Sequence, residues 1–121
     1  MRLNTLKFFL CLSLCFVITG LSSQSTQYYF SHYGIQEGLS QNTVNAILQD
    51  RTGFLWVGTK DGLNRFDGFS FRTFKRDILD KNSIGNNYIK VLHEDNRGKI
   101  WVGTDAGIYA VSYTHLRAHE T

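Results

Sequence analysis

The stretch Gly53-Phe54-Leu55-Trp56-Val57-Gly58-Thr59 returns 45 positions later as Gly98-Lys99-Ile100-Trp101-Val102-Gly103-Thr104. Self-similarity at a fixed period predicts stacked structural units, none of which buries its apolar faces alone. Two units fall below the usual minimum for such architectures, so we expect the chain to be part of a longer repeat array. Aligning residues 38–66 with 83–111 gives eight identical positions: Asn42/Asn87, Asp50/Asp95, Gly53/Gly98, Trp56/Trp101, Val57/Val102, Gly58/Gly103, Thr59/Thr104 and Gly62/Gly107.

Each repeat is predicted to form three strands joined by two tight turns. In the first copy the strands are Val44–Gln49, Phe54–Thr59 and Leu63–Phe66, all rich in β-forming residue types. The turns Asp50–Gly53 and Thr59–Gly62 each place a glycine fourth, which is typical of a hairpin loop closed by a left-handed glycine. A helical stripe through residues 44–48 is the alternative, but the short length and nearby turn glycines favour a strand.

Aromatic runs before the repeats predict a fourth strand for each unit. Tyr28–Tyr33 precedes the first copy and Phe69–Phe74 precedes the second. Four antiparallel strands per period of this length are typical of a β-propeller blade. Because the apolar residues of Val44–Gln49 do not alternate cleanly, we expect the sheets to be buried on both faces.

The N-terminal residues 1–23 are predicted to be a signal peptide. Arg2 and Lys7 precede a short apolar core over residues 8–20, and small residues follow near Ser22 and Ser23. The apolar run is shorter than the roughly 20 residues that span a bilayer. An uncleaved N-terminal anchor is the alternative.

The part that would be exported has no cysteine and almost no net charge. Both cysteines, Cys11 and Cys15, lie in the signal, so no disulfide is expected in the fold. Residues 24–111 hold ten Lys or Arg and nine Asp or Glu, a net charge of +1, against +3 for the whole chain. We therefore expect no nucleic-acid partner, and we interpret the basic residues around Phe71 and Phe74 as a solvated strand face.

Residues 112–121 break the repeat pattern abruptly. They resemble the translation of a sequencing-adapter read-through, and we interpret them as a non-native tail; a genuine divergent loop is the alternative. His115 and His119 have helical i,i+4 spacing but no third ligand, so we predict no metal site there. The predicted organisation is thus a signal at 1–23, a first blade at 24–68, a second blade at 69–111 and the tail. In fold class the chain is all-β, an incomplete propeller of about two four-stranded antiparallel blades.

The repeated side chains are interpreted as structural. We expect Trp56 and Trp101 to anchor the stack between blades, with a sugar-stacking platform as the alternative. Asp50 and Asp95 are expected to bind turn amides rather than to catalyse. The repeated glycines are expected at turns, bulges or points of close backbone approach, namely Gly53, Gly58, Gly62, Gly98, Gly103 and Gly107. No catalytic, cofactor-binding or metal-binding set emerges, and the sequence identifies no ligand-binding residue.

Three motifs together resemble the two-component regulator propeller repeat. They are Gly38-Leu39-Ser40-Gln41-Asn42, then Asp50-x-x-Gly53-Phe-Leu-Trp56-Val-Gly-Thr59, then Gly62-Leu63-Asn64-Arg65-Phe66-Asp67-Gly68. The resemblance covers residues 28–111. In the second copy Tyr109-Ala110-Val111 replaces Asn64-Arg65-Phe66, a departure from the pattern.

The resemblance implies the N-terminal periplasmic sensor region of a hybrid two-component histidine kinase. It implies that the remaining blades, a membrane anchor and the kinase lie elsewhere in a dimeric parent protein, and that an oligosaccharide is the ligand. The fragment itself is expected to be no enzyme. The alternatives are a propeller sensor for another output, such as a membrane-bound cyclase or a transcriptional regulator, and a secreted carbohydrate-active propeller enzyme.

Overall fold

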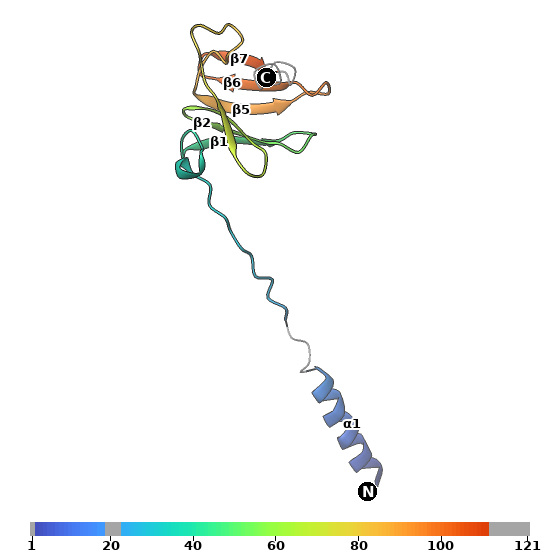
Figure 1. Cartoon of the computed structure of the whole chain (residues 1–121). Coiled ribbons are helices and arrows are strands. Elements are labelled where there is room, and N and C mark those ends of the chain that lie inside the picture. The colour runs from blue at the N-terminus through green and yellow to red at the C-terminus, as the bar shows by residue number, and fades with distance from the viewer. Residues whose placement is uncertain (1, 19–22, 112–121) are drawn as a thin grey trace. The chain divides into compact units, whose positions relative to one another are not determined.

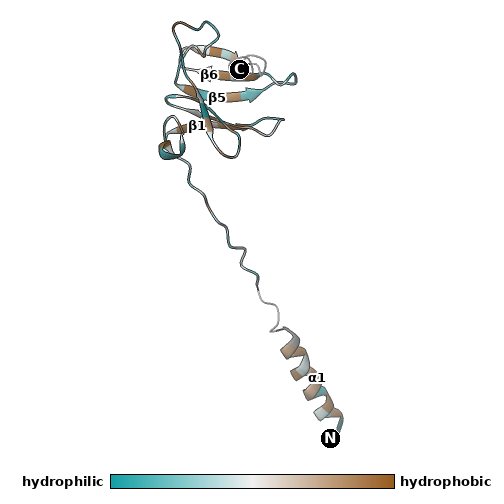
Figure 2. Ribbon diagram, viewed as in Figure 1, coloured by the Kyte–Doolittle hydropathy of each residue, from teal (hydrophilic) through white to brown (hydrophobic). Residues whose placement is uncertain are grey.

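The computed structural model describes residues 2–18 and 23–111, in two compact units, Met1–Ser31 and His32–Thr121 (Figure 1). The first unit contains helix α1 (Arg2–Ile18), which lies within the predicted signal and is largely apolar along its length (Figure 2). Within the described ranges, no helix has both the length and the apolarity needed to span a membrane. The predicted non-native tail lies outside the described residues.

The second unit consists of two antiparallel sheets that follow one another along the chain. Sheet 1 has the order β1-β2-β3-β4 and sheet 2 the order β5-β6-β7, each strand pairing with its sequence neighbour. The all-β class and the three-strand meander of each repeat are confirmed. A short 3-10 helix precedes sheet 1, and the bounds are η1 (Ile35–Glu37), β1 (Val44–Gln49), β2 (Leu55–Thr59), β3 (Gly62–Phe66), β4 (Phe71–Phe74), β5 (Ile89–Glu94), β6 (Ile100–Thr104) and β7 (Gly107–Val111).

The prediction of the fourth strand was wrong in its position. The run Phe69–Phe74 is predicted to belong to the second blade, but β4 within it pairs with β3, with Leu63 opposite Phe74 and Phe66 opposite Phe71. Sheet 1 is therefore completed by the strand that follows its meander, because a short turn at Asp67 keeps β4 beside β3. Residues 23–33 form no strand, and within the described ranges sheet 2 has three strands.

The expected burial of each sheet on both faces holds for β2 but not for β1. Four of the five residues of β2 are buried, whereas Ile47 in β1 is 63% exposed. The reason is that side chains alternate along a strand: Leu48 packs against the core between the sheets, so Ile47 lies on the other face, which no described sheet covers. The pairing of β1 with β2 also shifts register between Val44 and Ala46, which interrupts the alternation of side chains.

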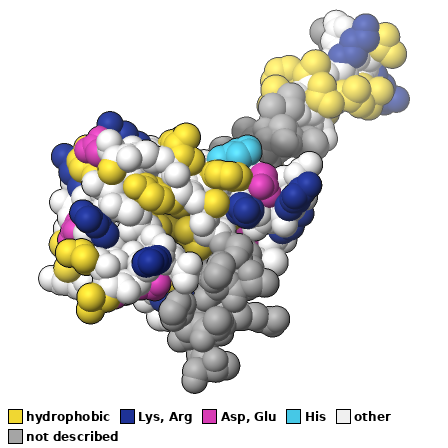
Figure 3. Space-filling model, turned by 90° about the horizontal axis from the view of Figure 1, so that it is seen from above, with side chains coloured by type: hydrophobic (Ala, Val, Ile, Leu, Met, Phe, Trp, Pro, Cys, Tyr) yellow, Lys and Arg dark blue, Asp and Glu magenta, His cyan; other side chains and the backbone are white. Residues whose placement is uncertain are grey.

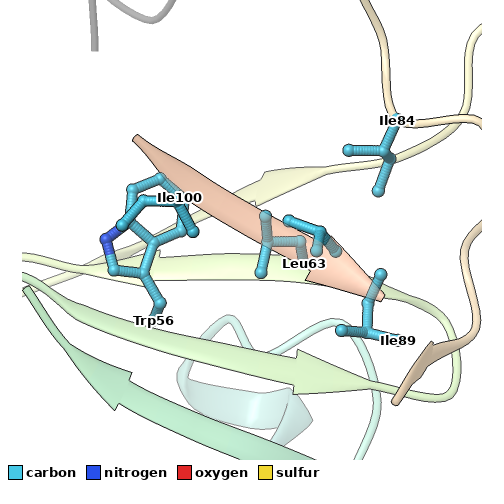
Figure 4. Close-up of a cluster of buried hydrophobic side chains, with 6 residues drawn as sticks. Trp56, Leu63, Ile84, Ile89 and Ile100 are labelled. Atoms are coloured by element: carbon cyan, nitrogen blue, oxygen red, sulfur yellow. The ribbon is translucent and has the colours of Figure 1, made fainter. Parts of the chain in front are cut away.

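The core lies between the two sheets (Figure 4). Sheet 1 contributes Trp56 and Leu63, both fully buried, and sheet 2 contributes three aliphatic side chains. Phe74 of β4 stacks on Trp56 with ring centroids 5.9 Å apart. The cluster contains Trp56, Leu63, Ile84, Ile89, Ile100 and Val102.

Gly58 sets how closely the sheets approach. A Cβ atom at this position would lie 2.4 Å from Cγ2 of Ile89, which belongs to the neighbouring sheet. The equivalent Gly103 would place a Cβ 2.4 Å from Cγ1 of Val91, which belongs to its own sheet. The same repeated glycine therefore makes room for the next sheet in the first copy and for a cross-strand neighbour in the second.

We expect Gly58→Ala to destabilise the protein by about 1–3 kcal/mol, because the added methyl pushes the two sheets apart. Gly103→Ala is the matched control, since the Val91 side chain can turn toward the open face of sheet 2. The urea concentration that removes half of the β-sheet circular dichroism measures both effects. Equal midpoints for the two variants would contradict this account of Gly58.

Candidate functional site

The turn at Asp50 is held by one carboxylate that serves three residues. Its Oδ1 accepts hydrogen bonds from the backbone N–H of Thr52 and of Phe54, both at 3.0 Å, and from the Thr52 hydroxyl at 2.7 Å. Its Oδ2 accepts the indole Nε1–H of Trp56 at 2.7 Å. Gly53, in the left-handed region with φ of 97°, closes the turn by donating to the Asp50 carbonyl.

The second repeat has the same arrangement. Oδ1 of Asp95 accepts the backbone N–H of Arg97 and of Lys99, and Oδ2 accepts the indole Nε1–H of Trp101 at 3.0 Å. Gly98 closes the turn, with φ of 81°. The spacing of six residues from aspartate to tryptophan is thus explained by one hydrogen bond that ties each hairpin loop to the strand that follows it.

Ionisation of Asp95 is favoured by these donors. The backbone N–H of Lys99, and after it the indole of Trp101, lower the pKa of the Asp95 carboxyl from its ordinary value of 3.8. Hydrogen bonds to a carboxylate stabilise its charged form relative to the neutral acid. The turn therefore carries a negative charge at neutral pH, and it is not set up as a general acid.

The two equivalent tryptophans differ sharply in burial. Trp56 is fully buried, whereas Trp101 is 39% exposed, and Leu63 is fully buried where its equivalent Ile108 is 73% exposed. Sheet 2 covers the first pair, and within the described residues no sheet covers the second. Figure 3 shows apolar side chains at the surface among Lys and Arg side chains. The face of sheet 2 that carries Trp101 and Ile108 is therefore exposed, whereas the equivalent face of sheet 1 is buried.

Arg51 joins the two hairpin tips and was not singled out from the sequence. Its Nε donates to Oε1 of Glu94 at 2.8 Å, and its backbone N–H donates to the other carboxylate oxygen. Its terminal nitrogens donate to the carbonyls of Asp95 and Asn96. Arg51 differs from Asn96, its equivalent in the second copy, so the repeat pattern carries no signal for this residue.

A buried polar network in the first repeat is replaced by an aromatic contact in the second. The Asn64 side chain accepts from the Ser40 N–H and donates to the Ser40 hydroxyl and to the Val57 carbonyl. In the second copy Gly85 and Tyr109 occupy the equivalent positions, and a Cβ on Gly85 would lie 2.2 Å from the Tyr109 ring. Tyr109, which replaces Asn64, thus fits because Gly85, which replaces Ser40, has no side chain.

A cleft of about 430 Å³ lies between β4, the loop that follows it and β7. Cations and anions are mixed along its walls, including Arg72, Lys81, Asp77 and Asp80. Phe74 and Ile84, together with Tyr109 and Val111 of β7, give the cleft its apolar lining. The cleft therefore offers polar contacts, but its mixed charges favour neither an anionic nor a cationic ligand.

In each repeat the aspartate binds the tryptophan of the same repeat, and the two aspartate–tryptophan pairs do not form one common site. Asp50 and Asp95 each bind their own turn and tryptophan, and Gly62 and Gly107 each close a β-turn with positive φ. Across residues 2–18 and 23–111 no group of three potential metal ligands is present. The arrangement is suited to stacking repeats against one another.

Comparisons with known proteins agree with this geometry. Residues 38–61 and 83–106 each match the family described as "Two component regulator propeller". These are two-component regulator propeller repeats.

Among solved structures, the chain resembles the extracellular domain of a hybrid two-component system, BT3049, from B. thetaiotaomicron, with a TM-score of 0.65 and 39% identity. It also resembles that of BT4673 from the same organism, with a TM-score of 0.55 and 30% identity. The matches cover 70% and 60% of this chain but 12% and 10% of those chains.

A curated relative is similar in sequence. "Histidine kinase P4" of Formosa agariphila is 42% identical over 69 residues, which is 57% of this chain and 5% of the relative. The chain therefore spans a small part of the length of each protein that it matches. Its two-component regulator repeats resemble the extracellular domains of such systems rather than a catalytic domain.

We expect Trp56→Phe to destabilise the fold by about 1–3 kcal/mol, because the buried Asp50 carboxylate loses a hydrogen-bond donor. Trp101→Phe is the matched control, since water can reach the Asp95 carboxylate in place of the indole. Urea unfolding followed by circular dichroism compares the two variants. An equally large shift for Trp101→Phe would show that the buried hydrogen bond is not the cause.

Proposed function

We propose that this chain is the N-terminal part of a periplasmic, ligand-sensing β-propeller that belongs to a hybrid two-component sensor histidine kinase. The observation that carries the proposal is the pair of two-component regulator repeats, which resemble the extracellular domains of such systems at 39% and 30% identity. The similarity to a histidine kinase over 69 residues supports the same output.

The open face of sheet 2 supports a role within a larger propeller. Trp101 and Ile108 occupy the positions that Trp56 and Leu63 fill in the core, yet they are exposed at 39% and 73%. Repeat proteins bury such a face against the next unit. The partners we propose are therefore further blades of the same propeller.

Sensing would proceed by a shift between two arrangements of the parent's extracellular region. A ligand that binds one arrangement more tightly populates it, and the difference in affinity biases the distant kinase. The ligand we propose is an oligosaccharide, in keeping with the resemblance of the repeats. The repeated Asp-Trp turns would serve as a rigid scaffold, and the loops that differ between repeats would carry specificity.

Export of the chain tests its placement in the periplasm. Fused at its C-terminus to alkaline phosphatase, which is active only after export, the full chain is expected to give phosphatase activity in bacterial cells. Replacing both Arg2 and Lys7 by Glu removes the positive start that a secretory signal needs, so activity should fall. The matched control replaces Lys60 and Lys81 by Glu. Absence of phosphatase activity from the unmodified fusion would refute an export signal here.

The output is tested by reading the source DNA across codon 111 with long reads. We expect the frame to continue through further propeller repeats and to reach a kinase core with its phosphorylated histidine and ATP-binding motifs. A cyclase or a DNA-binding domain in that place would replace the histidine kinase by another output. A propeller that ends with paired catalytic carboxylates would identify a secreted carbohydrate-active enzyme and refute the sensor.

A further inference from the structure

The motifs that both repeats share bring the two sheets together but do not fix their order. The face of sheet 1 that carries Trp56 packs against the face of sheet 2 that carries Ile100 and Val102. Side chains alternate along a strand, so Trp101 lies on the opposite face of sheet 2. Each sheet thus has one tryptophan face and one aliphatic face, and two sheets of this kind can stack in either order.

The hydrogen bonds near the starts of β1 and β5 are also compatible with either order. The backbone N–H of Gly62 donates to the carbonyl of Asn87 at 2.7 Å, and both residues recur at the equivalent positions of the other repeat. The side chain of Asn45 donates to the carbonyl of Ile89 at 2.9 Å. Every sheet offers such a backbone carbonyl, so neither contact distinguishes one neighbour from another.

The contact between the hairpin tips does distinguish the two sheets. Nε of Arg51 donates to one carboxylate oxygen of Glu94 at 2.8 Å, and the backbone N–H of Arg51 donates to the other at 3.0 Å. At the equivalent positions the second repeat has Asn96 in place of Arg51, and the first repeat has Gln49 in place of Glu94. Sheets stacked in the reverse order would therefore bring two neutral side chains together at the tips.

The Arg51 guanidinium also binds the backbone of the second tip. Its two terminal nitrogens donate to the carbonyls of Asp95 and Asn96, at 2.7 Å and 3.1 Å. A guanidinium holds its donors in a rigid planar fork, so these bonds form together only at one relative position of the tips. The side chain of Glu94 is 11% exposed, so solvent screens this ion pair less than it screens a fully exposed one.

We propose that the contact between Arg51 and Glu94 selects which sheet packs on the tryptophan face of sheet 1. The partner that it fits is a repeat sheet with a carboxylate at the end of its first strand, as sheet 2 has at Glu94. Sheets built from one motif have similar faces, so a residue outside the motif must discriminate between neighbours. The selection acts within this chain, so it is testable whatever the output of the proposed sensor.

Charge exchange within one chain tests the contact itself. Arg51→Glu places two carboxylates at the tips, and we expect the equilibrium constant for unfolding to rise at least about tenfold. Arg51→Glu combined with Glu94→Arg restores opposite charges and should recover a large part of this loss. Urea unfolding followed by circular dichroism measures both variants and the unmodified chain. A double variant no more stable than Arg51→Glu alone would overturn the pairing.

Mixing two variants tests the choice of partner. One full-length chain carries Arg51→Glu and the other carries Glu94→Arg, so each chain alone has like charges between its own sheets. When the two chains exchange sheets, with residues 75–88 as the hinge, both tip contacts join opposite charges. After joint refolding from urea we expect a 1:1 heterodimer, which native mass spectrometry identifies. Neither variant alone should dimerise, because exchange between identical chains leaves like charges together.

The matched control places the added guanidinium at the equivalent position of sheet 1. Gln49→Arg refolded together with Arg51→Glu should give no heterodimer, because the Gln49→Arg chain keeps its own contact between Arg51 and Glu94. A heterodimer in this control mixture, or its absence from the test mixture, would refute selection by the contact. Homodimers of either test variant alone would also refute it, since dimers would then form without matched charges.

Discussion

The indole ring of Trp56 lies fully buried between the two sheets, and its Nε1–H donates to the Asp50 carboxylate at 2.7 Å. One side chain therefore links a hairpin loop, the strand that follows it and the neighbouring sheet. The loop depends on the carboxylate, the carboxylate depends on a donor that is shielded from water, and the shielding depends on sheet 2. Removal of the indole takes the donor from Oδ2 of the buried Asp50 carboxylate, and removal of the carboxylate takes the acceptor from the buried indole Nε1–H; both changes are costly.

The two repeats keep this unit and vary what surrounds it. The aspartate and glycine of the turn, the tryptophan and the close-approach glycine are identical, whereas the buried network of Ser40 and Asn64 becomes a contact between Gly85 and Tyr109. The exchange works because both members change together: the larger ring enters the space that the lost side chain leaves. Variation in this fold is thus tolerated around the aspartate and tryptophan, provided that the packed volume is preserved.

The division between the parts that both repeats share and the parts that differ bears on the proposed sensing function. A scaffold of stacked sheets, joined at the hairpin tips by Arg51 and Glu94, holds the loops in fixed relative positions. Function in such folds resides in the loops and in how whole units move, because a well-packed core does not deform gradually. The exposed face of sheet 2, with Trp101 and Ile108, repeats the face of sheet 1 that is buried against sheet 2.

The sequence by itself determined the period, the strands of each meander and the turns, since Asp and Gly at fixed places leave the backbone few alternatives. Its first copy also carries three motifs that resemble the two-component regulator propeller repeat, and both copies match that family. Only the tertiary structure decided that Phe71–Phe74 closes the first sheet, that Trp56 is buried while Trp101 is not, and that Arg51 joins the tips. The physical reason is that local pattern fixes backbone conformation, whereas the partner of an edge strand and the burial of a face depend on which other unit lies beside it.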